Sequence, residues 1–396
     1  MKRIVFVDDE QNILQGLRRM LRPMRHEWEM HFADSADAAL EIMRDGEFDV
    51  VVTDMRMPGK DGAALLEIVR REHPGTARII LSGHAEQEMA IRSVAATHQF
   101  LAKPCDADTL RNTVQRTCQL RGMLASERLR RLTAEVGQMP SVPEVYERIS
   151  AEMGKDEPSL AEISTIVSED LGMTAKLLQL VNSAFFGLRR HVASVDHAVA
   201  YLGMDVIRSL VLSESAFKAF DHAKGGVSPD TLMRRGRRVA ALAKAIARHE
   251  SDNKVLADEA FQAGMMHELG KLILAAELPS EYQRVSEAMD AGALQDAAER
   301  DAFEVTQGEV GAYLLGLWGL ADGIVESLAY HREPSRTEVS GFAPIVAVHA
   351  AAALTSVGEP DALPLDDAWL ESIGLAEAVE TWRDLASIQP NERDAA

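Results

Sequence analysis

The chain has 396 residues, 46% of them hydrophobic and 26% charged, which is typical of a globular protein with two or three domains. Its 42 basic and 62 acidic residues leave a formal net charge of −20, which disfavours nucleic acid and anionic membranes as partners. Its cysteines, Cys105 and Cys118, are too few for a disulfide framework. No apolar run approaches the ~18 residues of a membrane span, so we expect a cytoplasmic protein.

Short apolar runs alternate with helical patterns through the first 120 residues. The predicted strands are residues 4–7, 30–32, 50–53, 79–81 and 100–102. The predicted helices are residues 11–21, 38–44, 63–71 and 87–95, the second of them capped by Ser35. Strands that alternate with single helices favour a doubly wound α/β domain, in which helices cover both faces of a parallel sheet.

A long helical pattern follows this domain. Apolar residues recur at spacings of three to six between Leu110 and Val136. This spacing predicts the last helix of the first domain and a helical linker, with a coiled coil that forms a homodimer as the alternative. Pro140 and Pro143 end the pattern, because a helix does not continue through proline.

The rest of the chain predicts helices alone, since no series of strand patterns interrupts them. These helices are residues 160–167, 173–181, 195–202, 206–212, 239–247, 260–276 and 310–317, with one or two short helices between 366 and 385. The predicted organisation is an α/β domain at 1–120, a helical linker at 121–138, an all-α domain at 139–345 and an acidic C-terminal extension at 346–396.

Charged and hydroxyl side chains stand at the carboxyl ends of four predicted strands. Asp8 and Asp9 follow the first strand, Asp54 the third, Ser82 the fourth and Lys103 the fifth. Binding sites of open α/β sheets form at this edge. Clustered carboxylates repel one another unless a cation lies between them, and Mg²⁺ prefers such oxygen ligands. Aspartyl phosphate is a known covalent intermediate, so these residues predict a phosphoryl-accepting site.

The motifs around these residues resemble the receiver domain of two-component response regulators. They are Phe6–Glu10, Thr53–Pro58, Asp61–Gly62 and Lys103–Pro104, in this order. The resemblance covers residues 1 to about 120 and implies a flavodoxin-like fold. It also implies a phosphorelay, in which a sensor histidine kinase or a phosphotransfer protein phosphorylates Asp54.

The same resemblance implies the ligands of a magnesium ion. Asp9, Asp54 and the backbone carbonyl of Arg56 would bind Mg²⁺ directly, and Asp8 would bind it through a water molecule. Each of these groups presents an oxygen atom, which suits a hard cation.

Three further residues receive roles from the resemblance. Lys103 would contact the phosphoryl group, Ser82 takes the position of the switch hydroxyl, and Phe100 takes that of the switch aromatic. Phosphorylation adds charge and acceptor oxygens at the rim, so Ser82 would move in and Phe100 would rotate into the space that it leaves. The face made by residues 87–100 would then repack. The resemblance also implies that the peptide bond between Lys103 and Pro104 is cis.

A second resemblance concerns the helical domain. Residues 266–271 contain the adjacent pair His267 and Glu268. On one helix the two side chains would point about 100° apart. They would share a metal ion only together with ligands from other helices. Further segments resemble the HDOD domain, a helical relative of the metal-dependent HD phosphohydrolases. These segments are residues 139–143, 159–163, 178–187, 198–203 and 315–318, and the resemblance covers roughly residues 132–340.

The chain departs from the catalytic HD pattern at the metal ligands. An arginine cluster, residues 234–238, stands where catalytic relatives carry an earlier histidine, and arginine stays protonated and does not bind metals. We therefore expect no cofactor in the HDOD domain. The degenerate site predicted from this comparison consists of Arg235, His267, Glu268, Gln307, Tyr330 and His331.

Three explanations of the arginine cluster stay open. Its members are surface residues paired with nearby acids, or one of them replaces the lost metal charge beside Glu268, or they contact a ligand or partner. The sequence does not distinguish these explanations, because each requires partners from other segments.

These observations predict a response regulator in which phosphorylation of Asp54 controls protein–protein interactions of a non-catalytic HDOD output domain. By resemblance, a downstream signalling protein such as a cyclic-di-GMP enzyme is the expected partner. The alternative is a metal-dependent phosphohydrolase or phosphodiesterase with an atypical site at His267, Glu268 and His331.

Overall fold

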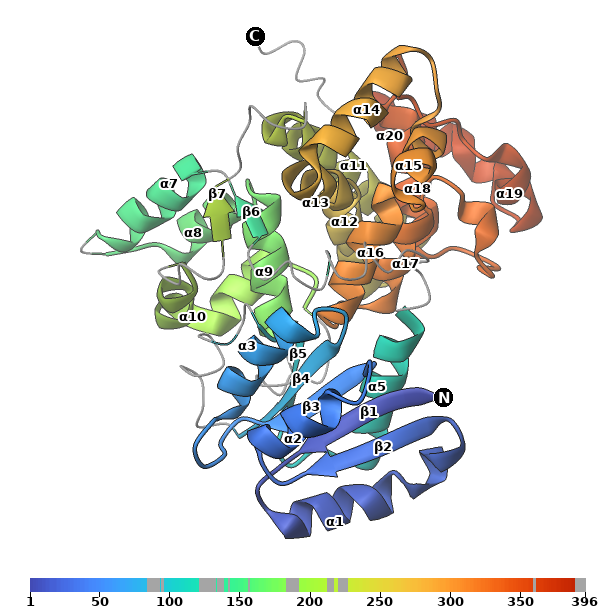
Figure 1. Ribbon diagram of the computed structural model, residues 1–396. Coiled ribbons are helices and arrows are strands. Elements are labelled where there is room, and N and C mark those ends of the chain that lie inside the picture. The colour runs from blue at the N-terminus through green and yellow to red at the C-terminus, as the bar shows by residue number, and fades with distance from the viewer. Residues whose placement is uncertain are drawn as a thin grey trace. The chain divides into compact units, whose positions relative to one another are not determined.

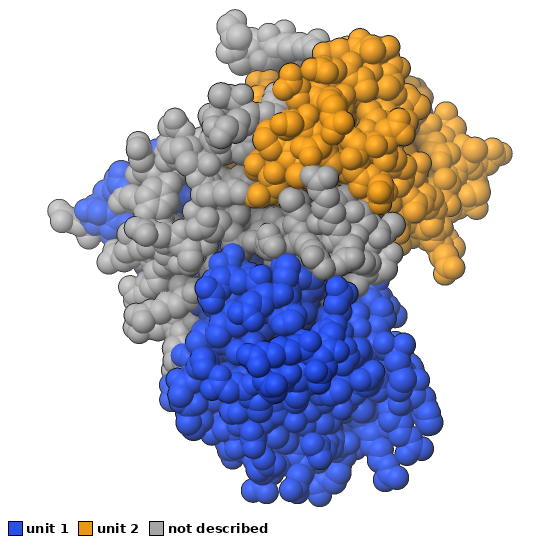
Figure 2. Space-filling view, viewed as in Figure 1, with its two compact units in different colours: residues 1–168, 172–219, 313–320 blue, residues 169–171, 220–312, 321–396 orange. Residues whose placement is uncertain are grey.

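The computed structural model falls into two compact units, coloured blue and orange in Figure 2. The first unit comprises residues 1–168, 172–219 and 313–320, and the second comprises residues 169–171, 220–312 and 321–396. The first unit therefore joins the predicted receiver domain to part of the predicted helical domain. The residues that the structure describes are 1–83, 93, 96–120, 133, 139–141, 143–155, 157–182, 192–211, 217–219, 227–358 and 361–388.

A five-stranded parallel sheet forms the centre of the receiver domain (Figure 1). All five predicted strands are present, and the spatial order of the strands is β2-β1-β3-β4-β5. The order reverses between β1 and β3, and the carboxyl ends of these two strands frame the crevice where such sheets bind ligands. The strands are β1 (Lys2–Val7), β2 (Trp28–Ala33), β3 (Val50–Asp54), β4 (Ala77–Ser82) and β5 (Gln99–Ala102).

Helices flank this sheet as the alternating pattern predicted. Val5, Val7 and Val51 join apolar residues of α2 and α3 in one core cluster, because successive strand residues point to opposite faces. The side chain of Ser35 accepts a hydrogen bond from the Ala38 backbone, which confirms the predicted N-cap. The predicted helix at 87–95 lies outside the described residues except for Ser93. The helices are α1 (Gln11–Met20), η1 (Arg22–His26), α2 (Ala36–Met43), α3 (Gly62–Glu72) and α5 (Ala107–Leu120).

The rest of the first unit is mainly helical but contains a small sheet. Strands β6 (Met139–Ser141) and β7 (Phe217–Ala219) pair in parallel, which contradicts the expectation that no strands occur in this domain. Each of the two strands has only three residues, which is too short for a strand pattern to be detected in the sequence. Apart from Thr133, the predicted linker lies outside the described residues. The helices are α7 (Pro143–Met153), α8 (Leu160–Val167), α9 (Leu171–Asn182) and α10 (Val195–Val211).

The second unit is built around helix α11, which packs along α12 and α18. The single helix predicted at 260–276 is wrong, because α12 ends at Met266 and α13 begins at Leu269. His267 and Glu268 lie in the break between them. Its helices are α11 (Pro229–Glu250), α12 (Lys254–Met266), α13 (Leu269–Glu277), α14 (Pro279–Asp290), α15 (Gln295–Phe303), α16 (Gln307–Leu317, shared with the first unit), α17 (Asp322–Tyr330), η3 (Pro334–Arg336), α18 (Pro344–Thr355), α19 (Asp367–Ser372), η4 (Ala376–Ala378) and α20 (Val379–Ile388).

One local and one tertiary contact accompany the break between α12 and α13. The His267 ring lies 2.7 Å from the Gly264 carbonyl oxygen, so it forms a side-chain hydrogen bond with the last turn of α12. The backbone of Gly270 also packs so closely on α16 that a Cβ there would lie 1.9 Å from the Gln307 carbonyl oxygen. Both contacts turn the chain at the histidine–glutamate pair.

Within the described part of the chain, no helix is both long and apolar enough to cross a bilayer.

Candidate functional site

Three charged side chains meet at the carboxyl edge of the receiver sheet. Asp8 follows β1, Asp54 ends β3, and Lys103 follows β5. Lys103 Nζ lies 2.8 Å from Asp8 Oδ2 and also pairs with Asp54 Oδ1. Asp8 is 1% exposed and Asp54 is 8% exposed, so solvent screens this cluster weakly. The structure therefore brings together side chains that lie almost 100 residues apart.

The electrostatics of this cluster suit a chemically active carboxylate. Burial raises the pKa of Asp54 above its usual range, and it outweighs the opposing effect of the Lys103 hydrogen bond. Burial alone would lower the pKa of Lys103, but hydrogen bonds to Asp54 and Asp8 raise it. Lys103 therefore stays charged beside the buried Asp54 carboxylate.

The other predicted receiver residues lie around this cluster. Asp9 is exposed at the end of β1, and the Arg56 backbone N–H donates to Asp54 Oδ2 at 2.9 Å. Ser82 is fully buried at the end of β4, and Phe100 is buried in the core cluster beside α2 and α3. The Lys103–Pro104 peptide bond is cis, as predicted. The carboxylates of Asp8 and Asp54 offer this rim oxygen atoms of the kind that Mg²⁺ binds.

A second polar site lies in the second unit, and we name it the HD pocket. It is a partly open cavity of about 40 Å³. Five of the six residues of the predicted degenerate site line it: Arg235, His267, Glu268, Gln307 and His331. Tyr330 does not line it, and its ring instead lies under the Arg336 guanidinium.

Four charged side chains form a network at this pocket. Arg235 binds Asp361 through two hydrogen bonds of 2.7 and 2.8 Å, and its guanidinium lies 3.6 Å from Glu268. Lys271 pairs with Glu268 and lies 3.4 Å from Asp361. Burial alone would raise the pKa of Glu268, but Lys271 and Arg235 lower it. Two fixed cations thus neutralise two carboxylates, so Glu268 stays ionised beside them.

Two histidines face each other in the same pocket. The rings of His267 and His331 lie 5.3 Å apart at 85°. Each Nδ1 lies within hydrogen-bond distance of a carbonyl oxygen, that of Gly264 or Leu328, so Nδ1 carries the proton and Nε2 is left as an acceptor. Burial lowers the pKa of both rings, which keeps them neutral. Among the described residues, no three His, Cys, Asp or Glu side chains are arranged to hold a metal ion.

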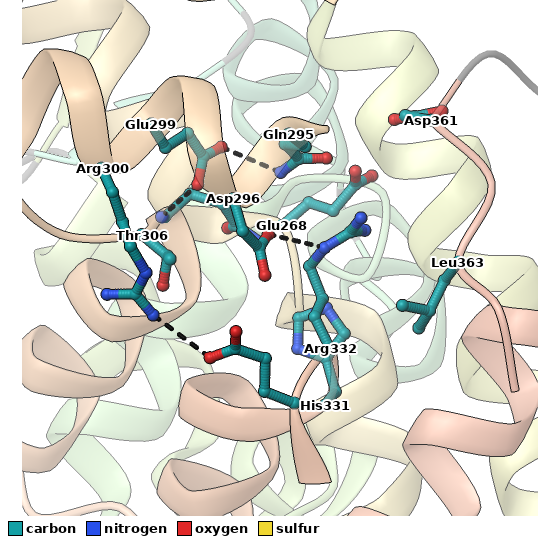
Figure 3. Close-up of polar contacts among 12 residues, drawn as sticks. Glu268, Gln295, Asp296, Glu299, Arg300, Thr306, His331, Arg332, Asp361 and Leu363 are labelled. Carbon is teal, nitrogen blue, oxygen red and sulfur yellow. Dashed lines mark hydrogen bonds and ion pairs between the residues drawn. The ribbon is translucent and has the colours of Figure 1, made fainter. Parts of the chain in front are cut away.

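Figure 3 shows a set of polar contacts formed by residues that line the HD pocket or lie next to it. Glu299 accepts from Gln295 Nε2 at 2.8 Å and from the Gln307 backbone at 2.7 Å, while Arg332 pairs with Asp296 at 2.7 Å. Burial raises the pKa of Glu299 to about 7. The Gln307–Glu299 bond joins the first residue of α16 to α15, and the Arg332–Asp296 pair joins the turn after α17 to α15.

The arginine cluster separates into two pairs. Arg235 and Arg238 line the HD pocket, and Arg238 donates to the Thr355 carbonyl oxygen. Arg234 and Arg237 are exposed on α11 and do not line the pocket. The geometry of Arg235 fits the explanation in which an arginine replaces a metal charge beside Glu268.

Two members of the network were missed in the sequence. Lys271 stands three residues after Glu268, a spacing that places two side chains on one face of a helical turn. The sequence spacing therefore indicated that these two residues could pair. Asp361 lies in the C-terminal extension, 126 residues from Arg235. No local pattern marks such a pair.

Replacement of Asp361 by asparagine is expected to lower the free energy of unfolding by about 1–2 kcal/mol, because Arg235 loses a charged, bidentate partner. Urea unfolding of the full chain measures this change. Asp258→Asn, which affects the more exposed Lys244–Asp258 pair, is the control and should change stability by less than about 1 kcal/mol. Equal effects of the two variants would contradict the assigned role of Asp361.

Comparison with known proteins identifies two domains in this order. A response regulator receiver domain matches residues 4–115, and an HDOD domain matches residues 139–334. The chain is similar to the regulatory protein AtoC of Escherichia coli, with 36% identity over 124 residues, which are 31% of this chain and 26% of AtoC. It is also similar to the sensor kinase CckA of Brucella abortus, with 38% identity over 115 residues, which are 28% of this chain and 12% of CckA.

Solved structures agree with the fold. A virulence factor from Campylobacter jejuni matches 68% of this chain and 96% of its own with a TM-score of 0.52, at 20% identity. The matched segments make up less than half of the length of AtoC and CckA. The rim of buried carboxylates, the parallel sheet and both domain matches lead to one conclusion: the chain belongs to the two-component signalling proteins and carries an N-terminal response regulator receiver domain and a C-terminal HDOD domain.

Proposed function

We propose that phosphorylation of Asp54 controls protein–protein interactions of a non-catalytic HDOD output domain. The cluster of Asp8, Asp54 and Lys103 carries this proposal, because it places a buried acceptor carboxylate within reach of a fixed cation. The phosphoryl group would form a bond to an Asp54 carboxylate oxygen and would leave its donor on the kinase or phosphotransfer partner.

The receiver residues have separate proposed roles in this step. Asp9, Asp54 and the Arg56 carbonyl would hold Mg²⁺, with Asp8 acting through water, and the ion would supply positive charge beside the transferred group. Lys103 would bind phosphoryl oxygens after releasing Asp54. Ser82 would donate a hydrogen bond to the same group, and Phe100 would repack with it.

The HD pocket supports a binding role rather than hydrolysis. A hydrolytic HD centre needs several neutral or anionic ligands and a water activated by the metal. In this chain Lys271 and Arg235 already neutralise Glu268, and Arg332 lines the cavity beside His331. A divalent cation would meet fixed positive charges there, which supports an output domain that acts by binding another protein.

The partners follow from the domains. A receiver domain implies a histidine kinase or phosphotransfer protein upstream, and a signalling protein, such as a cyclic-di-GMP enzyme, is the proposed downstream partner. A homodimer formed through the linker at 121–138 stays a further prediction. Light scattering of the full chain with and without beryllofluoride tests it, and a monomeric mass in both conditions would exclude it.

The acceptor role has a direct test. Wild-type protein incubated with Mg²⁺ and acetyl phosphate is expected to gain one acid-labile phosphoryl group, detected by mass spectrometry, and Asp54→Asn is expected to lose this gain completely. Asp61→Asn is the matched control, because Asp61 caps α3 close to the same rim. Retention of phosphorylation in Asp54→Asn, or equal loss in both variants, would refute the assignment of Asp54.

The non-catalytic role has a separate test. We expect full-length protein purified without chelator to contain no stoichiometric Mn, Fe or Zn by plasma mass spectrometry. Metal near one equivalent that disappears in His267→Ala would instead favour the phosphohydrolase alternative at His267, Glu268 and His331. Hydrolysis of a phosphodiester by that protein would establish the alternative.

A further inference from the structure

Helix α16 has a receiver-facing end and a pocket-facing end. At the first end, a Cβ on Gly316 would lie 2.7 Å from two side-chain carbons of Leu120, at the end of receiver helix α5. Arg116, one turn earlier in α5, donates to the Leu320 carbonyl oxygen just after α16. Gly319, in the left-handed region, packs against the Gln99 side chain at the start of β5. The receiver therefore contacts the end of α16 directly.

Helix α9 reinforces the same contact within the first unit. Gln179 donates from Nε2 to the Thr97 carbonyl oxygen at 3.1 Å, immediately before β5. Lys176 donates to Gln179 Oε1 at 3.0 Å, and its Nζ lies 4.5 Å above the Trp318 ring. Both side chains on α9 are about 99% buried. Buried polar contacts of this kind are costly to break singly, so this contact has a defined geometry.

The other end of α16 begins in the HD pocket. Gln307, its first residue, donates from Nε2 to the His267 carbonyl oxygen at 3.0 Å and lines the cavity. Its backbone N–H donates to Glu299 at 2.7 Å. Its carbonyl oxygen is the atom that leaves no room for a Cβ on Gly270. A shift of α16 along its axis would therefore move Gln307 against the residues that flank Glu268.

The whole of α16 is buried, from Gln307 to Leu317. An α-helix of this length spans roughly 16 Å. Close-packed interiors move between discrete arrangements and do not deform continuously. A fully buried helix has no exposed face whose side chains could absorb a displacement, so a shift at one end reaches the other.

We propose that α16 carries the state of the receiver domain to the HD pocket, so that phosphorylation at Asp54 alters the Glu268 and Gln307 region. This inference rests on the proposed function and names the element through which the receiver regulates the output domain. Phe100, the switch aromatic, lies one residue from Gln99 on β5. Repacking of Phe100 would thus act on β5 next to its contact with the end of α16.

Hydrogen exchange of the full chain, with and without Mg²⁺ and beryllofluoride, tests the proposal. In the wild type we expect exchange at residues 264–271 and 307–312 to change by about fivefold or more, at the lower end of typical coupling between sites. Arg116→Ala and Leu120→Ala should keep the response of receiver residues 54–60 and lose the response of the pocket. Arg111→Ala is the matched control, because Arg111 lies on α5 but pairs with the exposed Asp108.

The outcomes separate this inference from the proposed function. A receiver response without a pocket response in the wild type would overturn the role of α16 and leave the proposed function intact. An unchanged pocket response in both Arg116→Ala and Leu120→Ala would also overturn it. A wild-type receiver that does not respond to beryllofluoride would refute the proposed function and the inference with it.

Discussion

Replacement of Lys271 by methionine is expected to lower the free energy of unfolding by about 3 kcal/mol or more, as removal of one partner from a buried ion pair generally does. Lys271 and Glu268 each expose only 7% of their side chains. Without Lys271, the Glu268 carboxylate stays buried with Arg235 at 3.6 Å as its remaining cation. Calorimetry or urea unfolding of the full chain measures the loss.

Two further variants show whether the loss comes from the unpaired charge. Glu268→Gln combined with Lys271→Met removes both charges, so the double variant should be more stable than Lys271→Met alone. Lys244→Met is the matched control, because Lys244 and Asp258 form a pair with 28% and 27% exposed side chains, which is worth about 1 kcal/mol or less. A Lys271→Met effect as small as that of Lys244→Met would contradict the network.

Acidification from about pH 7 to about pH 5.5 is expected to lower the stability of the folded chain through three buried histidines, while Glu299 acts in the opposite direction. Burial lowers the pKa values of His267, His331 and His349 below their usual value of 6.5. As the pH falls through 6.5, the unfolded chain takes up protons at these rings and the folded chain does not, so stability falls.

Glu299 acts in the opposite direction. Burial raises its pKa from 4.5 to about 7, so between these values the folded chain holds a proton that the unfolded chain lacks, and stability rises as the pH falls. Glu299→Gln removes this compensation. The loss of stability over the same interval should then be larger than in the wild type by about 1–2 kcal/mol.

Unfolding free energies measured at several pH values give these slopes, and the difference in slope between the wild type and Glu299→Gln is the result of interest. His249→Asn is the control, since the His249 side chain is 51% exposed on the surface of α11 and does not line the HD pocket. Equal slopes in the wild type and Glu299→Gln would contradict the raised pKa of Glu299.

His349 shows why the C-terminal region matters to this pH response. Its Nδ1 lies 2.7 Å from the His331 carbonyl oxygen, and its Nε2 accepts the Asp366 backbone N–H at 2.9 Å. Protonation of Nε2 would remove the second bond. The ring thus ties the segment after α18 to the pocket only while it is neutral.

Local patterns in the sequence were sufficient for the receiver domain. Apolar runs of four to six residues identify buried parallel strands, and the topology of such sheets places their carboxyl ends at one edge. Asp8, Asp54 and Lys103 could therefore be assigned to one site before their distances were known. The side chain of Ser35 could be assigned as a cap because capping depends on neighbouring residues alone.

The HD pocket was predictable only in part. Departures from the HD pattern pointed to Arg235, His267, Glu268 and Gln307, and these residues do line one cavity. The same reasoning placed His267 and Glu268 on a continuous helix, because hydrophobic periodicity does not register a break caused by close packing of Gly270 on Gln307. Hydrophobic periodicity indicates which face of a helix is buried. It does not indicate which neighbouring segment packs against that face.

Sequence alone determined the order of the domains, the sheet and the edge of the sheet where Asp8, Asp54 and Lys103 meet, since each depends on residue type, local spacing or a general rule of sheet topology. Tertiary structure alone decided that Asp361 binds Arg235 across 126 residues and that one end of α16 contacts the receiver while the other lines the HD pocket. Those pairings arise from the packing of helices whose crossing positions no local pattern encodes, so their partners became visible only in the folded chain.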